Sequence, residues 1–132
     1  MTQLDRRELA AVALGGAAGA LLRVWIGLNF AASAGTWPWA TLATNISGAF
    51  ALGYFATRLQ ERLPLSTYRR PLLATGFCGA YTTFSTVQVE ILRMLDRHLY
   101  GLAAGYAAAS ILAGYLAIWV ATATVRRTRV LR

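Results

Sequence analysis

Charged side chains divide this chain into long uncharged stretches. Four runs contain no Asp, Glu, Lys or Arg: residues 9–22, 24–57, 71–89 and 98–125. A helix needs about 20 predominantly apolar residues to cross a hydrocarbon layer roughly 30 Å thick. The runs therefore predict an all-α membrane protein with four transmembrane helices, at about 7–29, 38–58, 70–94 and 99–125.

The composition argues against a soluble domain. The 132 residues are 57% hydrophobic and 14% charged, with a mean hydropathy of +0.47, whereas a small soluble domain needs a charged surface. The length allows one domain, residues 1–132. Barrel strands would alternate in polarity, and the run LAAVALGGAAGALL does not. Residues 1–30 fit a signal peptide loosely, but the chain stays apolar beyond Arg23, which favours a first membrane helix.

The chain contains no lysine, so its 13 Lys-or-Arg positions are all arginine, and the net charge is +8. Four crossings would place both termini and the middle loop on one side, where most of the arginines would lie: Arg6, Arg7, Arg58, Arg62, Arg69, Arg70, Arg126, Arg127, Arg129 and Arg132. Arg93 and Arg97, with Arg23 if it reaches that interface, would lie on the other. The positive-inside rule then predicts cytoplasmic termini. We assign this charge to lipid headgroups and expect no nucleic-acid partner, because no basic face of a soluble fold exists.

Two glycine pairs lie one helical turn apart, Gly15 with Gly19 and Gly101 with Gly105. Such small-residue faces let helix backbones approach closely in lipid, so both pairs predict close helix packing. Four thin helices cannot enclose a wide pore. An oligomer is therefore expected on geometry alone.

The third predicted crossing contains the polar stretch GFCGAYTTFST. Glycine and β-branched threonine are mediocre helix formers, which makes a break in the helix one reading. A break at membrane depth must be buried in protein or line a cavity, and its freed carbonyl oxygens can hold a hard cation. An unbroken helix, with its hydroxyls bonded back to their own carbonyls, explains the pattern equally well.

The remaining polar groups at depth are neutral. Asn45 lies on the second crossing, and Tyr106 and Ser110 share one face of the fourth. Amide and hydroxyl donors suit an anion that is dehydrated but held weakly, and the positive edge of the Phe84 ring can add to them, although plain packing is commoner for one Phe. No acid lies in the middle of a predicted helix, His98 is alone, and no nucleophile has a base nearby. These absences predict neither a proton-coupled pump nor an enzyme.

Three stretches match a known family in order and spacing: GGAAGALLR at 15–23, WPWATLATNISGAF at 37–50 and TGFCGAYTTFST at 75–86. They make the chain similar, along nearly its whole length, to the CrcB (Fluc) family of small fluoride channels. The element G-x-x-T-T-F-S-T is highly specific. The resemblance implies passive, fluoride-selective export across a bacterial inner membrane, which lowers toxicity because HF enters the cell and ionises there.

The resemblance also implies an architecture and a set of site residues. The expected assembly is an antiparallel dimer with a broken third helix and two pores between the subunits. A structural sodium ion that is not transported would be held by the backbone carbonyls of Gly79 and Thr82. The candidate pore residues are Asn45 as a fluoride donor, Phe84, Tyr106, Ser110, Thr41, Thr83, Thr86 and Val87. Arg23 and Glu90 would lie in a vestibule.

Two features depart from the family pattern. Val87 replaces a second pore phenylalanine, and Gly114 replaces a serine expected in some members. The arginine bias also opposes a homodimer, because a homodimer of inverted subunits needs one chain to insert both ways. A homodimer and a heterodimer with a homologous chain of opposite orientation are therefore equally open.

Two other functions compete with the channel. A small four-helix proton-coupled drug exporter needs a membrane-embedded carboxylate, and only Glu90, near the end of a predicted helix, could supply it. An accessory membrane subunit would explain the size and the glycines, but not the polar third crossing together with Asn45 and Ser110.

Overall fold

The computed structural model describes residues 5–33, 35–61 and 68–127, and within them every regular element is helical. The predicted all-helical fold is thereby confirmed. The elements are α1 (Arg6–Asn29), α2 (Trp39–Glu61), η1 (Pro71–Cys78), α3 (Gly79–Tyr81), α4 (Phe84–Asp96) and α5 (Tyr100–Arg127), of which η1 is π-helical. The predicted crossings correspond to α1, α2, the series η1–α3–α4, and α5. Two of these, α1 and α5, are single helices long and apolar enough to cross a membrane.

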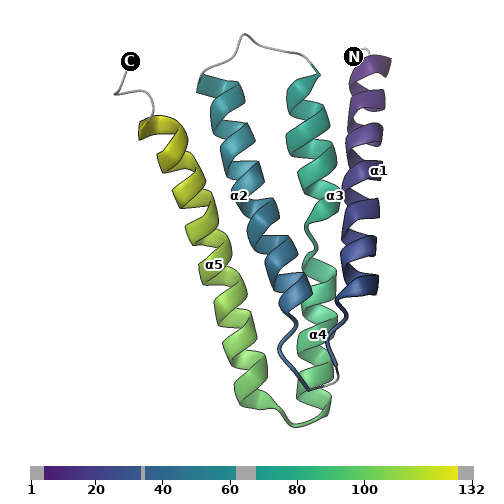
Figure 1. The fold of residues 1–132 in the computed structure, drawn as a ribbon, viewed down its shortest axis with the longest axis vertical. Coiled ribbons are helices and arrows are strands. Elements are labelled where there is room, and N and C mark those ends of the chain that lie inside the picture. Colours follow the sequence, from purple (N-terminus) through teal and green to yellow (C-terminus); the bar gives the residue numbers. More distant parts are fainter. Residues whose placement is uncertain (1–4, 34, 62–67, 128–132) are drawn as a thin grey trace.

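The helices run up and down beside one another (Figure 1). Helix α1 packs against η1 and α3, while α2 and α4 both pack against α5. The start of α1 and the end of α5 lie at the same end of the molecule, and α4 lies toward the other end. Residues 62–67 of the predicted middle loop, with Arg62, and the terminal Arg129 and Arg132 lie outside the described residues.

Glycines bring the backbones of α1 and η1 into contact. A Cβ atom added at Gly15 or Gly19 would overlap the backbone carbonyl oxygen of Leu72 or Phe77, respectively. From the other side, a Cβ at Gly76 would lie 2.6 Å from the Val12 carbonyl oxygen. The close packing predicted for Gly15 and Gly19 is therefore confirmed, and its partner is η1.

The second glycine pair behaves differently. A Cβ at Gly101 would have no atom within 4 Å, and one at Gly105 would come no closer than 3.8 Å, to the Trp37 ring. Within the described chain, the prediction of close packing at Gly101 and Gly105 is wrong. The glycine spacing identifies a face on which another backbone could pack closely, but no helix of the described residues lies on it.

The third helical segment, η1–α3–α4, is interrupted between α3 and α4. Thr82 (φ −78°, ψ 154°) and Thr83 (φ −145°, ψ 121°) are extended, and α4 begins at Phe84. Thr82 also does what the unbroken alternative expected, since its hydroxyl donates to the Cys78 carbonyl at 3.0 Å. The helix nevertheless ends there, so the structure favours the broken form of this segment.

A small core fills the space between α2, α4 and α5. Its buried residues are Leu42, Val87, Met94, Ala103 and Tyr106. The Trp37 ring packs edge-on against Tyr106, with 5.7 Å between the ring centroids. The core therefore ties α4 to both neighbouring helices and fixes the position of the segment that follows the break.

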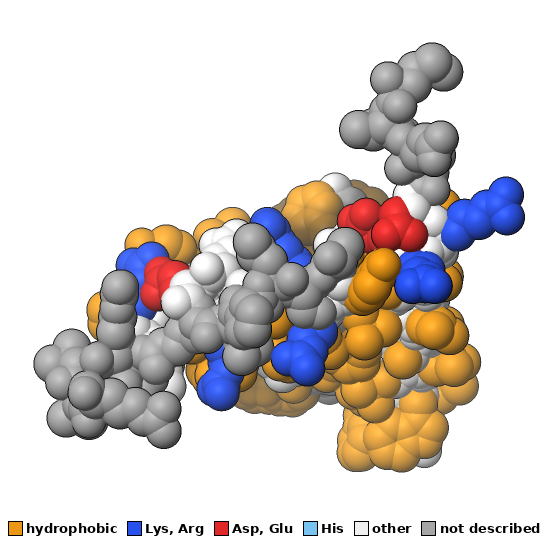
Figure 2. All heavy atoms as spheres, turned by 90° about the horizontal axis from the view of Figure 1, so that it is seen from above, with side chains coloured by type: hydrophobic (Ala, Val, Ile, Leu, Met, Phe, Trp, Pro, Cys, Tyr) orange, Lys and Arg blue, Asp and Glu red, His pale blue; other side chains and the backbone are white. Residues whose placement is uncertain are grey.

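Arginines gather at the end of the molecule where α1 begins and α5 finishes. Figure 2, which looks onto this end, shows several basic side chains spread across it. The described arginines at these helix ends are Arg6, Arg7, Arg58, Arg69, Arg70, Arg126 and Arg127. The fold thus collects on one surface the charges that the sequence assigns to one side of a membrane.

Candidate functional site

Asn45 holds the break between α3 and α4 from the neighbouring helix α2. Its Nδ2 donates to the Thr83 carbonyl at 2.9 Å, and its Oδ1 accepts from the Thr83 backbone N–H at 2.8 Å. In a continuous helix this N–H would donate to the carbonyl of Gly79, four residues earlier. Asn45 thus pairs both polar backbone groups of an extended residue and frees the Gly79 carbonyl from its helical partner.

Hydroxyl groups complete the start of α4. The Thr83 side chain caps the helix by accepting the Thr86 N–H at 3.2 Å. Its Oγ1 also lies 2.9 Å from Thr86 Oγ1 and 3.3 Å from Ser85 Oγ. The candidates Thr83 and Thr86 therefore form one hydroxyl cluster at the break, together with Ser85.

Glu90 joins three elements. Thr41 Oγ1 of α2 donates to Glu90 Oε1, and the Tyr106 hydroxyl of α5 donates to Glu90 Oε2, each at 2.6 Å. Ser110 then donates to the Tyr106 carbonyl at 2.8 Å. The sequence nominated all four residues but did not reveal this link, because Glu90 is 49 residues from Thr41 and 16 from Tyr106. Both predicted hydroxyl donors of α5 are already used inside the chain.

Arg23 reaches the break from α1. Its Nε donates to the Ala80 carbonyl at 3.0 Å, a group near the end of α3 whose usual helical partner lies beyond the break. Arg23 also lines a cavity of about 260 Å³, here named the Arg23 cavity, together with Thr41, Thr83 and Thr86. The predicted vestibule residue therefore lies beside the interruption itself.

The candidate pore residues Phe84 and Val87 have different surroundings. Phe84 is 75% exposed, so its ring makes few contacts within the chain. Val87, one turn later, is 6% exposed and belongs to the core with Tyr106. Val87 therefore lines no open surface of this chain, whereas Phe84 projects from it.

The sodium candidates lie at the end of α3. The methyl group of Thr82 packs against Gly48 of α2, whereas a Cβ atom added at Gly79 would have no atom within 4 Å. Within the part of the chain that the structure describes, no group of three or more His, Cys, Asp or Glu could hold a metal ion. A cation at the break would thus depend on carbonyl oxygens, and the diverted Thr83 N–H leaves the Gly79 carbonyl suited to that task.

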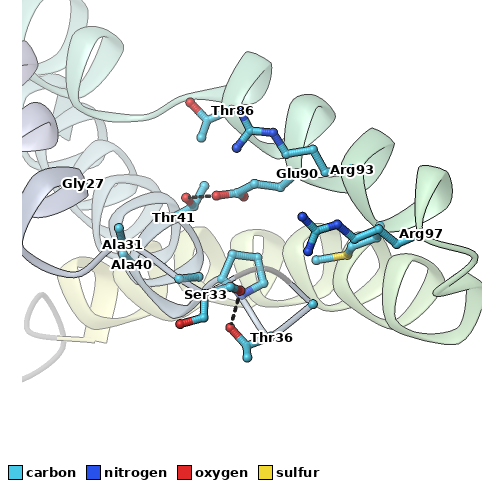
Figure 3. Close-up of a pocket in the computed structure, with 14 residues that line it drawn as sticks. Gly27, Ala31, Ser33, Thr36, Ala40, Thr41, Thr86, Glu90, Arg93 and Arg97 are labelled. Atoms are coloured by element: carbon cyan, nitrogen blue, oxygen red, sulfur yellow. Dashed lines mark hydrogen bonds between the residues drawn. The ribbon is translucent and has the colours of Figure 1, made fainter.

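A second cavity, of about 390 Å³, opens beside α4 and is here named the α4 cavity (Figure 3). Glu90, Arg93 and Arg97 face it from α4, and Thr41 faces it from α2. It adjoins the Arg23 cavity through four shared lining residues: Gly27, Ala40, Thr41 and Thr86. Arg93 and Arg97 were not among the site residues predicted from the sequence, although their spacing from Glu90 places all three on one helical face.

The residues of this site lie in a region that matches known proteins. Residues 10–122 match the family model described as CrcB-like protein, Camphor Resistance (CrcB). The chain is 60% identical over 132 residues to the fluoride-specific ion channel FluC 1 of Mycolicibacterium paratuberculosis, covering all of both chains. It is 54% identical over the same length to FluC 1 of Mycobacterium tuberculosis. FluC 2 of Geobacillus kaustophilus is 38% identical over 120 residues, 90% of this chain and 93% of that one.

The family match spans most of the chain, and two relatives match it from end to end. The break, Asn45 and the Thr83 cluster all lie inside the matched region. The chain therefore belongs to the CrcB family.

Proposed function

We propose that this chain is a fluoride-specific ion channel that lets fluoride leave the cytoplasm passively. The observation that carries this function is its end-to-end relation to proteins named fluoride-specific ion channels. The chain is a membrane channel and not an enzyme. HF crosses membranes and ionises in the cell, so a fluoride-selective leak down the electrochemical gradient removes the ion without an energy source.

The proposed channel is an antiparallel dimer with a pore on each side of the subunit interface, in a bacterial inner membrane. The exposed ring of Phe84 supports this arrangement, because a large apolar side chain beside a polar break is otherwise left with few protein contacts. The open face at Gly101 and Gly105 is a second surface on which another backbone could pack.

Fluoride would pass Phe84 and the polar groups beside it. Asn45 uses one amide N–H on Thr83, and an amide nitrogen carries two, so one donor can face a passing anion. Thr83, Thr86 and Thr41 continue the polar lining toward the α4 cavity. Val87, Tyr106 and Ser110 lie deeper in the subunit and would shape the path through the groups that they hold in place.

The proposed sodium ion sits at the dimer centre, bound by the backbone carbonyls of Gly79 and Thr82 and not transported. What supports it is the diversion of the Thr83 N–H to Asn45, which leaves a carbonyl without its helical donor. Sodium is a hard cation and prefers such oxygen ligands. When bound, the ion would hold the helix break of one subunit against the helix break of the other.

The decisive experiment is to purify this chain alone, reconstitute it in liposomes, and follow fluoride efflux beside chloride efflux. Fluoride release without chloride release, from this chain alone or together with a co-expressed homologous chain, is the expected result. Phe84→Ile should reduce the fluoride rate while the protein still elutes as the same assembly, because the exposed ring contributes little to the fold. If a co-expressed homologous chain is also present and fluoride is still retained in the liposomes, the channel assignment is wrong.

A further inference from the structure

The α4 cavity carries an unbalanced positive charge. Arg93 and Arg97 point into it, three and seven residues after Glu90 on α4 (Figure 3). Asp96, which lies between them in sequence, does not line the cavity. Two guanidinium groups and one carboxylate therefore share this space, with a net charge of one positive unit.

Glu90 does not neutralise the arginines by pairing with them. Its two carboxylate oxygens accept from Thr41 and Tyr106. Across residues 5–33, 35–61 and 68–127, neither the Arg93 nor the Arg97 guanidinium group has an ion-pair or hydrogen-bond partner. The two guanidinium groups are thus left to face the cavity.

The walls of the cavity strengthen the field of these charges. Gly27, Ala31, Ala40 and Met94 supply apolar lining. A concave site of one charge sign with low-dielectric walls focuses the field and raises the local concentration of the opposite ion about tenfold or more. Guanidinium groups stay charged at every physiological pH and are weakly hydrated, so they attract anions without changing their own state.

We propose that Arg93 and Arg97 form an anion-concentrating collar at one mouth of the conduction pathway. The ligand class is a small monovalent anion, held weakly and exchanged rapidly, because the exposed arginines build no closed cage around it. That this anion is fluoride rests on the proposed function. The collar is joined to the break by the residues that the α4 and Arg23 cavities share, Thr41 and Thr86 among them.

The first test measures the cavity potential without any transport. Ser33 lines the α4 cavity and is exposed, so Ser33→Cys gives a reporter thiol, while the native Cys78 is only 1% exposed and the parent chain measures its background. Its reaction rates with an anionic and a cationic methanethiosulfonate reagent of similar size are compared. At about 10 mM salt, Arg93→Gln with Arg97→Gln should lower the anionic-to-cationic rate ratio about tenfold or more.

Screening and charge-matched variants make this result specific. The difference should vanish near 1 M salt, where the screening length is about 3 Å. Arg93→Lys with Arg97→Lys should keep the parent ratio, and Arg127→Gln, at the far end of α5, should leave it unchanged. If the rate ratio does not change with the two Gln substitutions, or if their effect does not depend on salt, the collar is wrong whether or not the chain conducts fluoride.

The second readout is fluoride efflux from liposomes. In the double Gln variant, efflux should fall about tenfold at low ionic strength and approach the parent rate at high ionic strength. An equal fall at both would mean that the arginines act structurally, and would also overturn the collar. A parent chain that carries no fluoride even beside a co-expressed homologous chain contradicts the proposed function instead, and the thiol measurement still decides the charge of the cavity.

Discussion

At the scale of single residues, Asn45 is the link between the break and its chemistry. The sequence marks it as a polar side chain at depth, and the structure pairs it with both backbone groups of Thr83. An unpaired backbone group in lipid costs several kcal/mol, so this side chain makes an interrupted helix tolerable there. The same contact changes the role of Gly79, because its carbonyl loses the donor that a helix would supply.

The freed carbonyl leads to a prediction about sodium. If Gly79 and Thr82 bind the ion at the dimer centre, exchanging sodium for potassium or N-methylglucamine during purification should weaken the dimer. A site kept at 100 times its dissociation constant contributes about 2.7 kcal/mol, which the exchange removes. Size-exclusion chromatography after heating, in each cation, measures this. A dimer of equal stability in all three cations would contradict the sodium site.

At the scale of elements, the helices could be predicted and their partners could not. Uncharged apolar runs are long enough to mark membrane helices, and the intervening charges mark their ends. The break stayed undecided because the helix propensities of Gly and Thr differ from those of good formers by only about 1 kcal/mol or less per residue. What settles it is Asn45, 38 residues away in sequence, and propensity contains no information about such a contact.

The two glycine pairs show the same limit. Gly15 with Gly19 and Gly101 with Gly105 have the same spacing, yet among the helices that the structure describes only the first pair packs closely against another helix. Small residues permit a close approach without specifying what approaches. The Glu90 contacts were missed for a related reason, since hydroxyl donors from α2 and α5 meet it only in the folded chain.

Packing of α1 against η1 can be tested by adding one methyl group. In Gly19→Ala the new Cβ would overlap the Phe77 carbonyl oxygen and lie 3.0 Å from the Tyr81 nitrogen, so the backbones must separate. Overpacking of this kind costs about 1–3 kcal/mol. Thermal unfolding in detergent, followed by circular dichroism, should show the loss as a lower midpoint.

Gly27→Ala provides the matched control on the same helix. A Cβ there has no atom within 4 Å, so the substitution should be neutral, or stabilising by up to about 1 kcal/mol through helix propensity. If Gly19→Ala unfolds at the same temperature as Gly27→Ala, the close contact between α1 and η1 does not support the fold.

At the scale of the whole molecule, the two ends differ in charge. The start of α1, the ends of α2 and α5, and the start of η1 bring most of the described arginines to one surface (Figures 1 and 2). The opposite end carries Arg93 and Arg97 beside the α4 cavity. The arginine bias read from the sequence is therefore a property of two opposed surfaces, which is the form in which the positive-inside rule acts.

This asymmetry predicts one dominant orientation, with the arginine-rich end in the cytoplasm. A cysteine placed at the C-terminus in a Cys78→Ala background should react with an impermeant thiol reagent about tenfold faster from the cytoplasmic side, compared in intact cells and inverted vesicles. Since an antiparallel dimer needs the other orientation as well, that outcome would require a homologous partner chain in the membrane. Equal labelling from both sides would show that this chain inserts both ways and can form the antiparallel dimer alone.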